Sequence, residues 1–144
     1  MDEPAVHRDA IRDLLARYTY NGDRGRVSEL AACFAADGML EYPGASPVGP
    51  RAIETALSSG TRNSKLTFVR HHITNPLIDI DGGTATARSY FAVHSNIGLD
   101  HSGTYDDRLI HTTNGWRFAH RRVRIDWQAD ASLFRSMVSR RESN

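Results

Sequence analysis

The sequence has few of the residues that cross-link a chain or place it in a membrane. Among its 144 residues Cys33 is the only cysteine, so no disulfide can form within the chain and a reducing compartment is expected. No stretch approaches the roughly 18 consecutive apolar residues of a membrane-spanning helix. The opening segment, MDEPAVHRDA, lacks the apolar core of a secretory signal. These absences predict a cytoplasmic protein.

Motifs that would indicate a cofactor or a nucleic acid are also missing. There is no GxGxxG or GxxxxGK[ST] run for nucleotide phosphates and no GxSxG run for a hydrolase serine. The formal net charge is +1, which gives no reason to expect nucleic acid or an anionic membrane as a partner. The histidines show neither HxH nor HxxxE spacing. We therefore expect no cofactor and no metal.

The first half of the chain has the spacing of apolar side chains that is typical of amphipathic helices. Residues 5–21 carry Ile11, Leu15 and Tyr18 on one face, and the Asn-Gly pair that closes this segment would end the helix. Further elements are expected as follows: a helix over 26–36, a short strand over 39–42 and a helix over 51–57.

The second half is rich in β-branched and aromatic residues and predicts an antiparallel meander. The expected strands cover 65–80, 84–97, 103–112 and 116–127, with turns at 81–83, 98–102 and 113–115. Helices followed by such a meander predict an α+β fold, a cone-shaped barrel with the N-terminal helices packed on a strongly curved mixed or antiparallel sheet. We expect a single domain over 1–144, with its core over 5–130 and a short helix and tail over 131–144.

Several segments resemble SnoaL-like proteins of the nuclear-transport-factor-2-like superfamily. They are IRDLLARYTYNGDRG, FAADGMLEYPG, RHHITNPLIDIDGGTATARSYF and GTYDDRLIHTTNGWRFAHRRVRIDW, which together reach over about residues 5–130. The final RIDWQADASLF is similar to scytalone dehydratase-like members. The resemblance implies the same cone-shaped fold. Its members include dehydratases, a dehydrochlorinase, ketosteroid isomerases, polyketide cyclases and epoxide hydrolases, so the fold alone does not name the reaction.

Asp23 and His71 are the first candidates for chemistry. In the dehydratases and the dehydrochlorinase of this group, an aspartate after the first helix pairs with a histidine in an RHH-like segment, and these two residues fall at those positions. A carboxylate that accepts the imidazole N–H fixes the tautomer and makes the other ring nitrogen a better base. Without the resemblance, Asp23 reads as a turn residue and His71 as a hydrogen-bonded strand residue.

Strand alternation separates His71 from its neighbour His72. Val69, His71 and Ile73 share one face of the predicted strand, and His72 lies on the other. The family register assigns the face of His71 to the cavity. A shift of one residue would exchange the two histidines.

Other catalytic candidates follow from their positions in the resembled proteins. Tyr18 lies on the buried stripe of the first helix, where its hydroxyl could donate to a substrate carbonyl or leaving hydroxyl, or simply pack in the core. Tyr42 is a second candidate for the same donor because of its place on the predicted short strand, and otherwise packs in the cavity wall. His94 lies near the second histidine of scytalone dehydratase-like proteins and would supply a second titratable group; otherwise it is an exposed strand residue.

The expected substrate pocket has further contributors. Asp106, in GTYDDRL, falls near a cavity-facing asparagine of scytalone dehydratase-like proteins, and an acid there departs from that pattern. A metal site of Asp23, His71 and His94 is the minor reading, because the ligand spacing does not favour it. The residues expected to contact substrate are Phe34, Tyr42, Val69, Tyr90 and Asp106. The histidines expected at the surface are His7, His101, His111 and His120.

The residues and the resemblance together predict a cofactor-independent dehydratase for a small hydrophobic, aromatic, polyketide-like or steroid-like substrate. The alternatives are an isomerase or a polyketide cyclase that begins with the same proton abstraction, and a non-catalytic ligand-binding or assembly module. Because helices cover only one face of the sheet, we expect aromatic and branched side chains on the other face to be buried in a homodimer or homotrimer.

Overall fold

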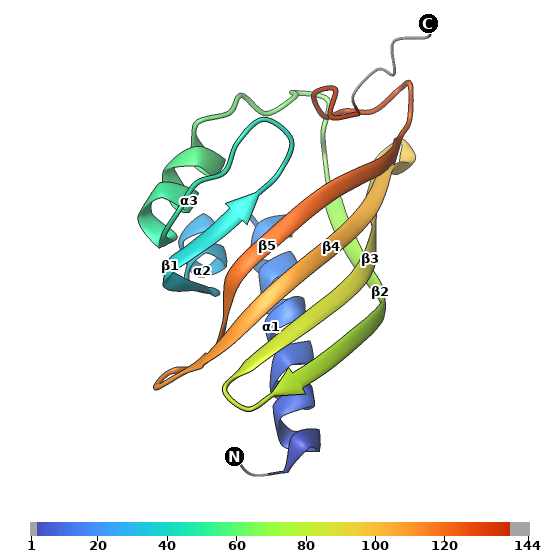
Figure 1. Ribbon diagram of the computed structural model, residues 1–144. Helices are drawn as coiled ribbons and strands as arrows, with labels where there is room; N and C mark the ends of the chain where they lie inside the picture. Colours follow the sequence, from blue (N-terminus) through green and yellow to red (C-terminus); the bar gives the residue numbers. More distant parts are fainter. Residues whose placement is uncertain (1–2, 139–144) are drawn as a thin grey trace, which may run out of the picture.

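Residues 3–138, the part of the chain that the computed structural model describes, form helices packed on a five-stranded sheet (Figure 1). The elements are α1 (Pro4–Asp23), α2 (Val27–Ala31), β1 (Phe34–Glu41), α3 (Pro50–Ser58), β2 (Val69–Asp81), β3 (Thr84–Ser95), β4 (Gly98–Thr112) and β5 (Gly115–Gln128). No helix in this part of the chain is long and apolar enough to cross a membrane.

The sheet is mixed and open. Its strand order is β1-β5-β4-β3-β2, in which β1 runs parallel to β5 and all other neighbours are antiparallel. It curls around α1, which lies behind the sheet in Figure 1. The predicted α+β class, with helices on a curved mixed sheet, is confirmed, although the sheet does not close on itself.

The helix α1 is longer than the sequence predicts. Pro4 stands in its first turn, where a missing N–H costs nothing, and Ile11, Leu14 and Leu15 are buried against the sheet. The helix continues through the expected stop and ends at Asp23. The Asp23 carboxylate is thereby carried on the last helical residue.

The predicted helix over 26–36 is wrong beyond its first turn. The helix α2 has only five residues, and Phe34 instead begins β1, where it pairs with Phe118 of β5. Gly38, which falls between the predicted helix over 26–36 and the predicted strand over 39–42, lies inside β1. A Cβ there would stand 2.5 Å from the Phe118 carbonyl oxygen, so close approach of two strands, rather than a turn, explains this glycine.

Two boundaries near the end of the chain also differ from prediction. The β3–β4 hairpin turns at 96–97, so residues 98–102 belong to β4 rather than to a turn. Residues 131–138 form turns and bends instead of the expected helix. The Ala129 N–H donates to the Asp100 carbonyl at 2.8 Å, so the chain after β5 is held beside β4 at this end of the sheet. The predicted tail over 139–144 lies outside the described residues.

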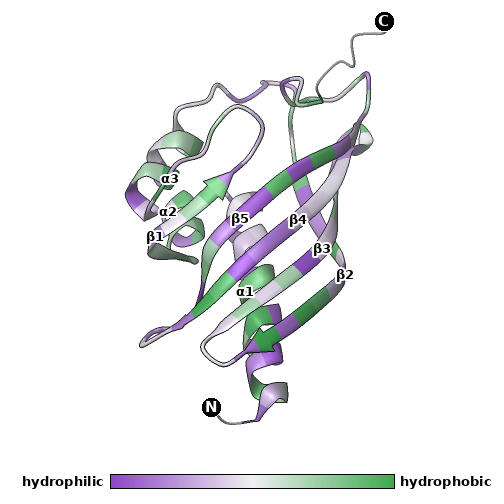
Figure 2. Cartoon of the chain, in the orientation of Figure 1, coloured by the Kyte–Doolittle hydropathy of each residue, from purple (hydrophilic) through white to green (hydrophobic). Residues whose placement is uncertain are grey.

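Alternation along the strands gives the sheet an inner face toward α1 and an outer face away from it. On β3, Ala87, Phe91 and Val93 are buried on the inner face, whereas Arg88 and His94 are exposed on the outer face. Figure 2 shows hydrophilic and hydrophobic residues following one another along β4 and β5. The outer face is mixed: it carries charged side chains together with the exposed Leu77, Tyr90 and Ile110, whereas most of the large apolar side chains point inward.

Candidate active site

The Asp23 carboxylate holds His71 through two hydrogen bonds. Its Oδ1 lies 2.5 Å from His71 Nδ1, and its Oδ2 accepts the His71 backbone N–H at 2.9 Å. An ionised carboxylate can only accept, so Nδ1 carries a proton, and in the neutral form of the ring Nε2 is the nitrogen with the free lone pair. The side chains are 9% and 25% exposed for Asp23 and His71, so the pair is shielded yet accessible. The two predicted partners thus meet where α1 ends beside the start of β2.

A row of inward-facing side chains crosses the sheet from His71. His71 pairs with Val93 on β3, and Val93 pairs with His101 on β4. Directly paired residues point to the same face, so the two histidines both face inward, about 10 Å apart across Val93. The Phe91 ring centroid lies 6.3 Å from each imidazole. This end of the inner face therefore carries a second histidine beside the Asp23–His71 pair.

Asp100 is a fully buried carboxylate that accepts four hydrogen bonds. Oδ1 accepts from His101 Nδ1 at 2.8 Å and Ser132 Oγ at 2.6 Å, and Oδ2 accepts from Ser95 Oγ and the Leu133 N–H, each at 3.0 Å. Burial opposes ionisation, but these hydrogen bonds outweigh it and lower the pKa of Asp100 below its ordinary value. Asp100 therefore joins β3, β4 and the segment after β5 beside His101.

His101 is the site residue that the sequence analysis misses. It is 5% exposed, although it was expected at the surface. Burial lowers its pKa below the ordinary 6.5; the Asp100 carboxylate opposes this shift, and the charge of His71 adds to it. His101 is thus neutral near pH 7, with Nδ1–H bonded to Asp100. Alternation back from the inward-facing Tyr105 places Gly103 and His101 on the same face. The sequence analysis did not apply it to His101, because the predicted strand began only at residue 103.

We expect His101→Asn to weaken the loss of stability on mild acidification. As the pH falls below about 6.5, the unfolded chain takes up the His101 proton before the folded chain does, so the free energy of unfolding decreases. Asparagine keeps an N–H donor for Asp100 but does not titrate. Urea unfolding of both proteins near neutrality and about one pH unit below 6.5 measures the difference. Equal losses in the two proteins would contradict this prediction.

A hollow of about 440 Å³ lies between α1 and the edge strand β2. Leu15, Ala16 and Thr19 line it from the helix, and His71 and Ile73 line it from the strand. The volume falls within the range of small-molecule sites, and the wall mixes apolar side chains with the imidazoles of His71 and His72 and the guanidinium of Arg12. The hollow therefore opens beside the Asp23–His71 pair at the side of the sheet.

The interior of the cone is occupied by an ion pair within aromatic rings. Arg121 donates from Nε and Nη2 to the two carboxylate oxygens of Asp107, each at 2.8 Å, and neither side chain is exposed. Its guanidinium carbon lies 3.8 Å from the Tyr105 ring centroid and 4.3 Å from those of Tyr18 and Phe118. Burial opposes the charge of Arg121, but Asp107 outweighs it and raises the pKa of Arg121. The interior is therefore filled and charged, unlike the apolar pocket that the sequence predicts.

A bulge in β5 turns Arg121 inward. Relative to β4, Ala119 is an extra residue between Phe118 and His120. Phe118 and Arg121 are an odd number of residues apart, so regular alternation would place them on opposite faces. The bulge puts both on the inner face and leaves Arg122 outside.

Three predicted site residues lie on the outer face, away from the pair. His94 is exposed and packs edge-on against His72, with ring centroids 4.9 Å apart. Tyr90 is 57% exposed on the same face of β3. Asp106 also points outward, and its neighbour Asp107 takes the inward position. The predicted placement of these three in the cavity is wrong, because the residues next to them in β3 and β4 take the inward positions.

The same alternation excludes the metal site of Asp23, His71 and His94 that was considered as an alternative. His94 and His71 lie on opposite faces of the sheet, so they cannot converge with Asp23 on one ion. Within residues 3–138 there is no group of three or more His, Cys, Asp or Glu side chains placed to hold a metal.

The other predicted contributors belong to the core. The Tyr18 ring lies 6.2 Å from that of Phe34, and burial raises the pKa of Tyr18 to about 12, so its hydroxyl stays protonated. Val69 is buried in a cluster next to the Tyr18 ring. Tyr42 follows β1 and lines a different hollow together with Val123. None of these is among the residues that line the hollow at His71.

Comparisons with known proteins agree with this architecture. The family model for the SnoaL-like domain matches residues 4–122. A protein of unknown function from Mycobacterium tuberculosis is 31% identical, with a TM-score of 0.74 over 86% of this chain and 76% of that one. A candidate scytalone dehydratase from Novosphingobium aromaticivorans is 25% identical, with a TM-score of 0.76 over 90% and 91% of the two chains. ActVI-ORFA from Streptomyces coelicolor, at 18% identity, shares the fold with a TM-score of 0.74 over 83% and 96%.

No curated protein matches the chain. The family match nevertheless covers most of its length, including both members of the Asp23–His71 pair and both members of the Asp107–Arg121 pair. The chain belongs to the SnoaL-like domain family.

Proposed function

We propose that this chain is a cofactor-independent dehydratase whose base is His71 Nε2. The observation that carries the proposal is the double hydrogen bond from His71 to Asp23, which fixes the ring and leaves Nε2 as the free acceptor. As the imidazole takes a proton, the adjacent carboxylate stabilises the positive charge that forms. The similarity to a candidate scytalone dehydratase supports the same class of reaction.

The proposed reaction needs no oxidant, reductant or second acid. His71 Nε2 removes a proton from the carbon next to a carbonyl, and the C–H electrons form the new double bond as a hydroxyl leaves the next carbon. The proton on His71 then passes to the departing hydroxide, and water is released. His101 is neutral near pH 7 and faces inward in the same row, but it does not line the hollow at His71, so the proposed step assigns it no contact with the substrate.

The hollow beside α1 indicates the class of substrate. Its volume of about 440 Å³ and its apolar lining residues, which include Leu15, Ile73 and Pro76, favour a small, largely apolar hydroxycarbonyl compound. An isomerase or a cyclase would use the same first step. The non-catalytic alternative is favoured by a different observation: Tyr18, Tyr105 and Arg121 fill the cone interior, where a substrate of this fold would be expected.

Incubation with a panel of small β-hydroxyketones in deuterated water tests the proposal. A dehydratase yields a product lighter than the substrate by one water, as read by mass spectrometry. Deuterium exchange next to the carbonyl without loss of water indicates an isomerase or cyclase instead. Binding of the same compounds, seen as a thermal shift, with neither change would leave a binding module.

A further inference from the structure

The hollow between α1 and β2 is lined by basic groups and by no acidic one. Arg12 of α1 lines it together with the imidazoles of His71 and His72, and its other lining residues are uncharged. Asp23 is not among them, because its carboxylate is bound to Nδ1 of His71. An anion inside the hollow therefore meets positive charge at the wall and no negative charge.

Arg12 has no acidic partner in the described part of the chain. Its side chain is exposed and makes no hydrogen bond or ion pair there. Asp9 and Asp13, the nearest acids along α1, do not line the hollow, and Asp13 binds Arg17 at 2.7 Å instead. Arg8, one turn before Arg12, donates to a backbone carbonyl of β2 and adds a second positive charge at this end of the hollow. The charge of Arg12 is thus left for a ligand.

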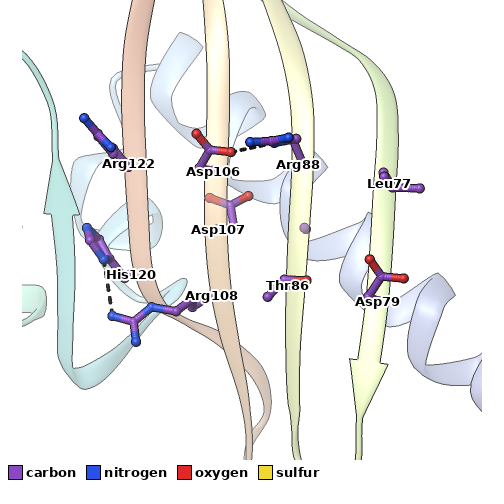
Figure 3. Close-up of a pocket in the computed structure, with 10 residues that line it drawn as sticks. Leu77, Asp79, Thr86, Arg88, Asp106, Asp107, Arg108, His120 and Arg122 are labelled. Atoms are coloured by element: carbon purple, nitrogen blue, oxygen red, sulfur yellow. Dashed lines mark hydrogen bonds and ion pairs between the residues drawn. The ribbon is translucent and has the colours of Figure 1, made fainter.

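A hollow on the outer face of the sheet shows the contrast (Figure 3). It is lined by the basic residues Arg88, Arg108, Arg122 and His120 and by the acids Asp79, Asp106 and Asp107. Arg88 Nε lies 2.9 Å from Asp106 Oδ1, and Arg122 Nε lies 3.0 Å from Oε2 of Glu41. Most of the positive charge there is balanced by acids of the same chain, which is not the case beside α1.

The shape of the β2 edge disfavours another strand as the occupant. The strand β2 bulges at Asn75 and Pro76, where two residues stand opposite one of β3 and Asn75 has a φ of 56°. Pro76 lines the hollow and has no N–H to donate. The N–H of His71 is already bound to Asp23. A strand added here would lack these two donors, so a small molecule fits this wall better.

We propose that the hollow binds a small organic carboxylate, whose carboxylate group is held by Arg12 and whose apolar body extends toward His71. A guanidinium matches a carboxylate through two parallel N–H···O bonds, so a single arginine serves one such group. Leu15, Ala16 and Ile73 line the hollow and supply the contacts for the apolar body.

The reverse orientation of the ligand is disfavoured. His71 lies beside the last turn of α1, where the unpaired helix carbonyls and the Asp23 carboxylate are negative. Arg12 lies about three turns earlier, roughly 16 Å from Asp23 along the helix axis. A carboxylate is therefore attracted to the Arg12 end and repelled from the other, which leaves the far end of the molecule beside the proposed base.

This inference deepens the proposed function and rests on it for the reaction. The substrate class becomes a hydroxycarbonyl compound that carries a carboxylate at the end remote from the reacting carbon. The contact with Arg12 then positions that carbon at Nε2 of His71. Binding of the carboxylate does not require the reaction, so the two proposals are tested separately.

Calorimetric titration of the intact chain with three compounds of the same body tests the inference. They are hydrocinnamate, its methyl ester and phenylpropylammonium. The acid is expected to bind at least about tenfold more tightly than the ester, because its hydrogen bonds to Arg12 are charge-assisted. The ammonium compound should bind no more tightly than the ester. Equal affinities for acid and ester overturn the inference, and so does an ammonium compound that binds as tightly as the acid.

Variants of Arg12 locate the preference for the acid. Arg12→Gln should remove it and leave the affinity for the ester unchanged. Arg12→Lys should keep part of it, because an ammonium group holds a carboxylate as a point charge without the paired N–H bonds. Arg12 is exposed, so both variants are expected to fold, which circular dichroism verifies.

The matched control is Arg88→Gln, which removes one positive charge from an exposed arginine on the outer face (Figure 3). This variant should keep the full preference for the acid. A preference that survives Arg12→Gln, or one that Arg88→Gln abolishes as well, overturns the inference.

The panel of β-hydroxyketones separates this inference from the proposed reaction. If no compound loses water while hydrocinnamate still binds through Arg12, the reaction is refuted and the carboxylate site stands. If neutral hydroxyketones lose water while hydrocinnamate binds no better than its ester, the reaction stands and the carboxylate site is refuted.

Discussion

Replacing His71 with alanine is expected to lower turnover by at least about 10²-fold, with little loss of stability. The substitution removes Nε2, the proposed base, together with the ring that Asp23 orients. The His71 side chain is a quarter exposed and is not part of the core, so its loss should cost little stability. Initial rates on the substrate found by the deuterium panel, together with a melting curve for each protein, measure both effects.

Three further variants determine whether the two residues act as a unit. Asp23→Asn is expected to be damaging as well, because an amide can donate to Nδ1 and so favours the wrong tautomer. The double variant Asp23→Asn/His71→Ala should be hardly slower than His71→Ala alone. His72→Ala should have a clearly smaller effect than His71→Ala, since His72 packs against His94 and makes no hydrogen bond to Asp23, although it also lines the hollow. A strong effect of His72→Ala with a weak effect of His71→Ala would refute the assignment of the base.

Replacing Asp107 with alanine is expected to reduce the free energy of unfolding by about 3–5 kcal/mol. The change leaves the guanidinium of Arg121 buried without its counter-ion, and Nη1 of Arg121 already lacks a hydrogen-bond partner among residues 3–138. Aromatic rings offset only part of a buried charge. Urea denaturation near pH 7 is the measurement.

The control for this experiment is Asp13→Ala, which breaks an ion pair whose two side chains are more than half exposed. It is expected to cost less than about 1 kcal/mol. Replacing both Asp107 and Arg121 with apolar residues of similar volume should recover much of the stability, because no unpaired charge then remains. Similar losses for Asp107→Ala and Asp13→Ala would show that the buried pair contributes no more than a surface pair.

The sequence predicted the parts of the fold and site that depend on regular periodicity. The buried stripe of α1 and the turn between β2 and β3 follow directly from residue spacing and turn composition. Strand alternation separated His71 from His72, the resemblance to the family selected His71 for the inner face, and the hydrogen bonds to Asp23 are consistent with that choice. The catalytic role of His71 remains a prediction.

The errors occur where periodicity is interrupted. Asp100 is an extra residue in β4 opposite β3, so it and His101 are both buried, although consecutive strand residues normally face opposite ways. The extra residue Ala119 does the same for Phe118 and Arg121. A bulge is defined by the pairing of two strands, so the spacing of apolar residues within one strand does not predict it. A helix pattern through Phe34 was likewise overridden by pairing with a distant strand.

The parallel pairing of β1 with β5 has a consequence for the order of folding. The strands β2 to β5 are joined by short hairpins, so their contacts close small loops at low entropic cost. Joining Phe34 to Phe118 instead closes a loop that takes in more than half of the chain. The meander is therefore expected to assemble first and β1 to dock afterwards. Until it docks, β5 presents an unpaired edge, and association between nascent chains is most probable at that stage.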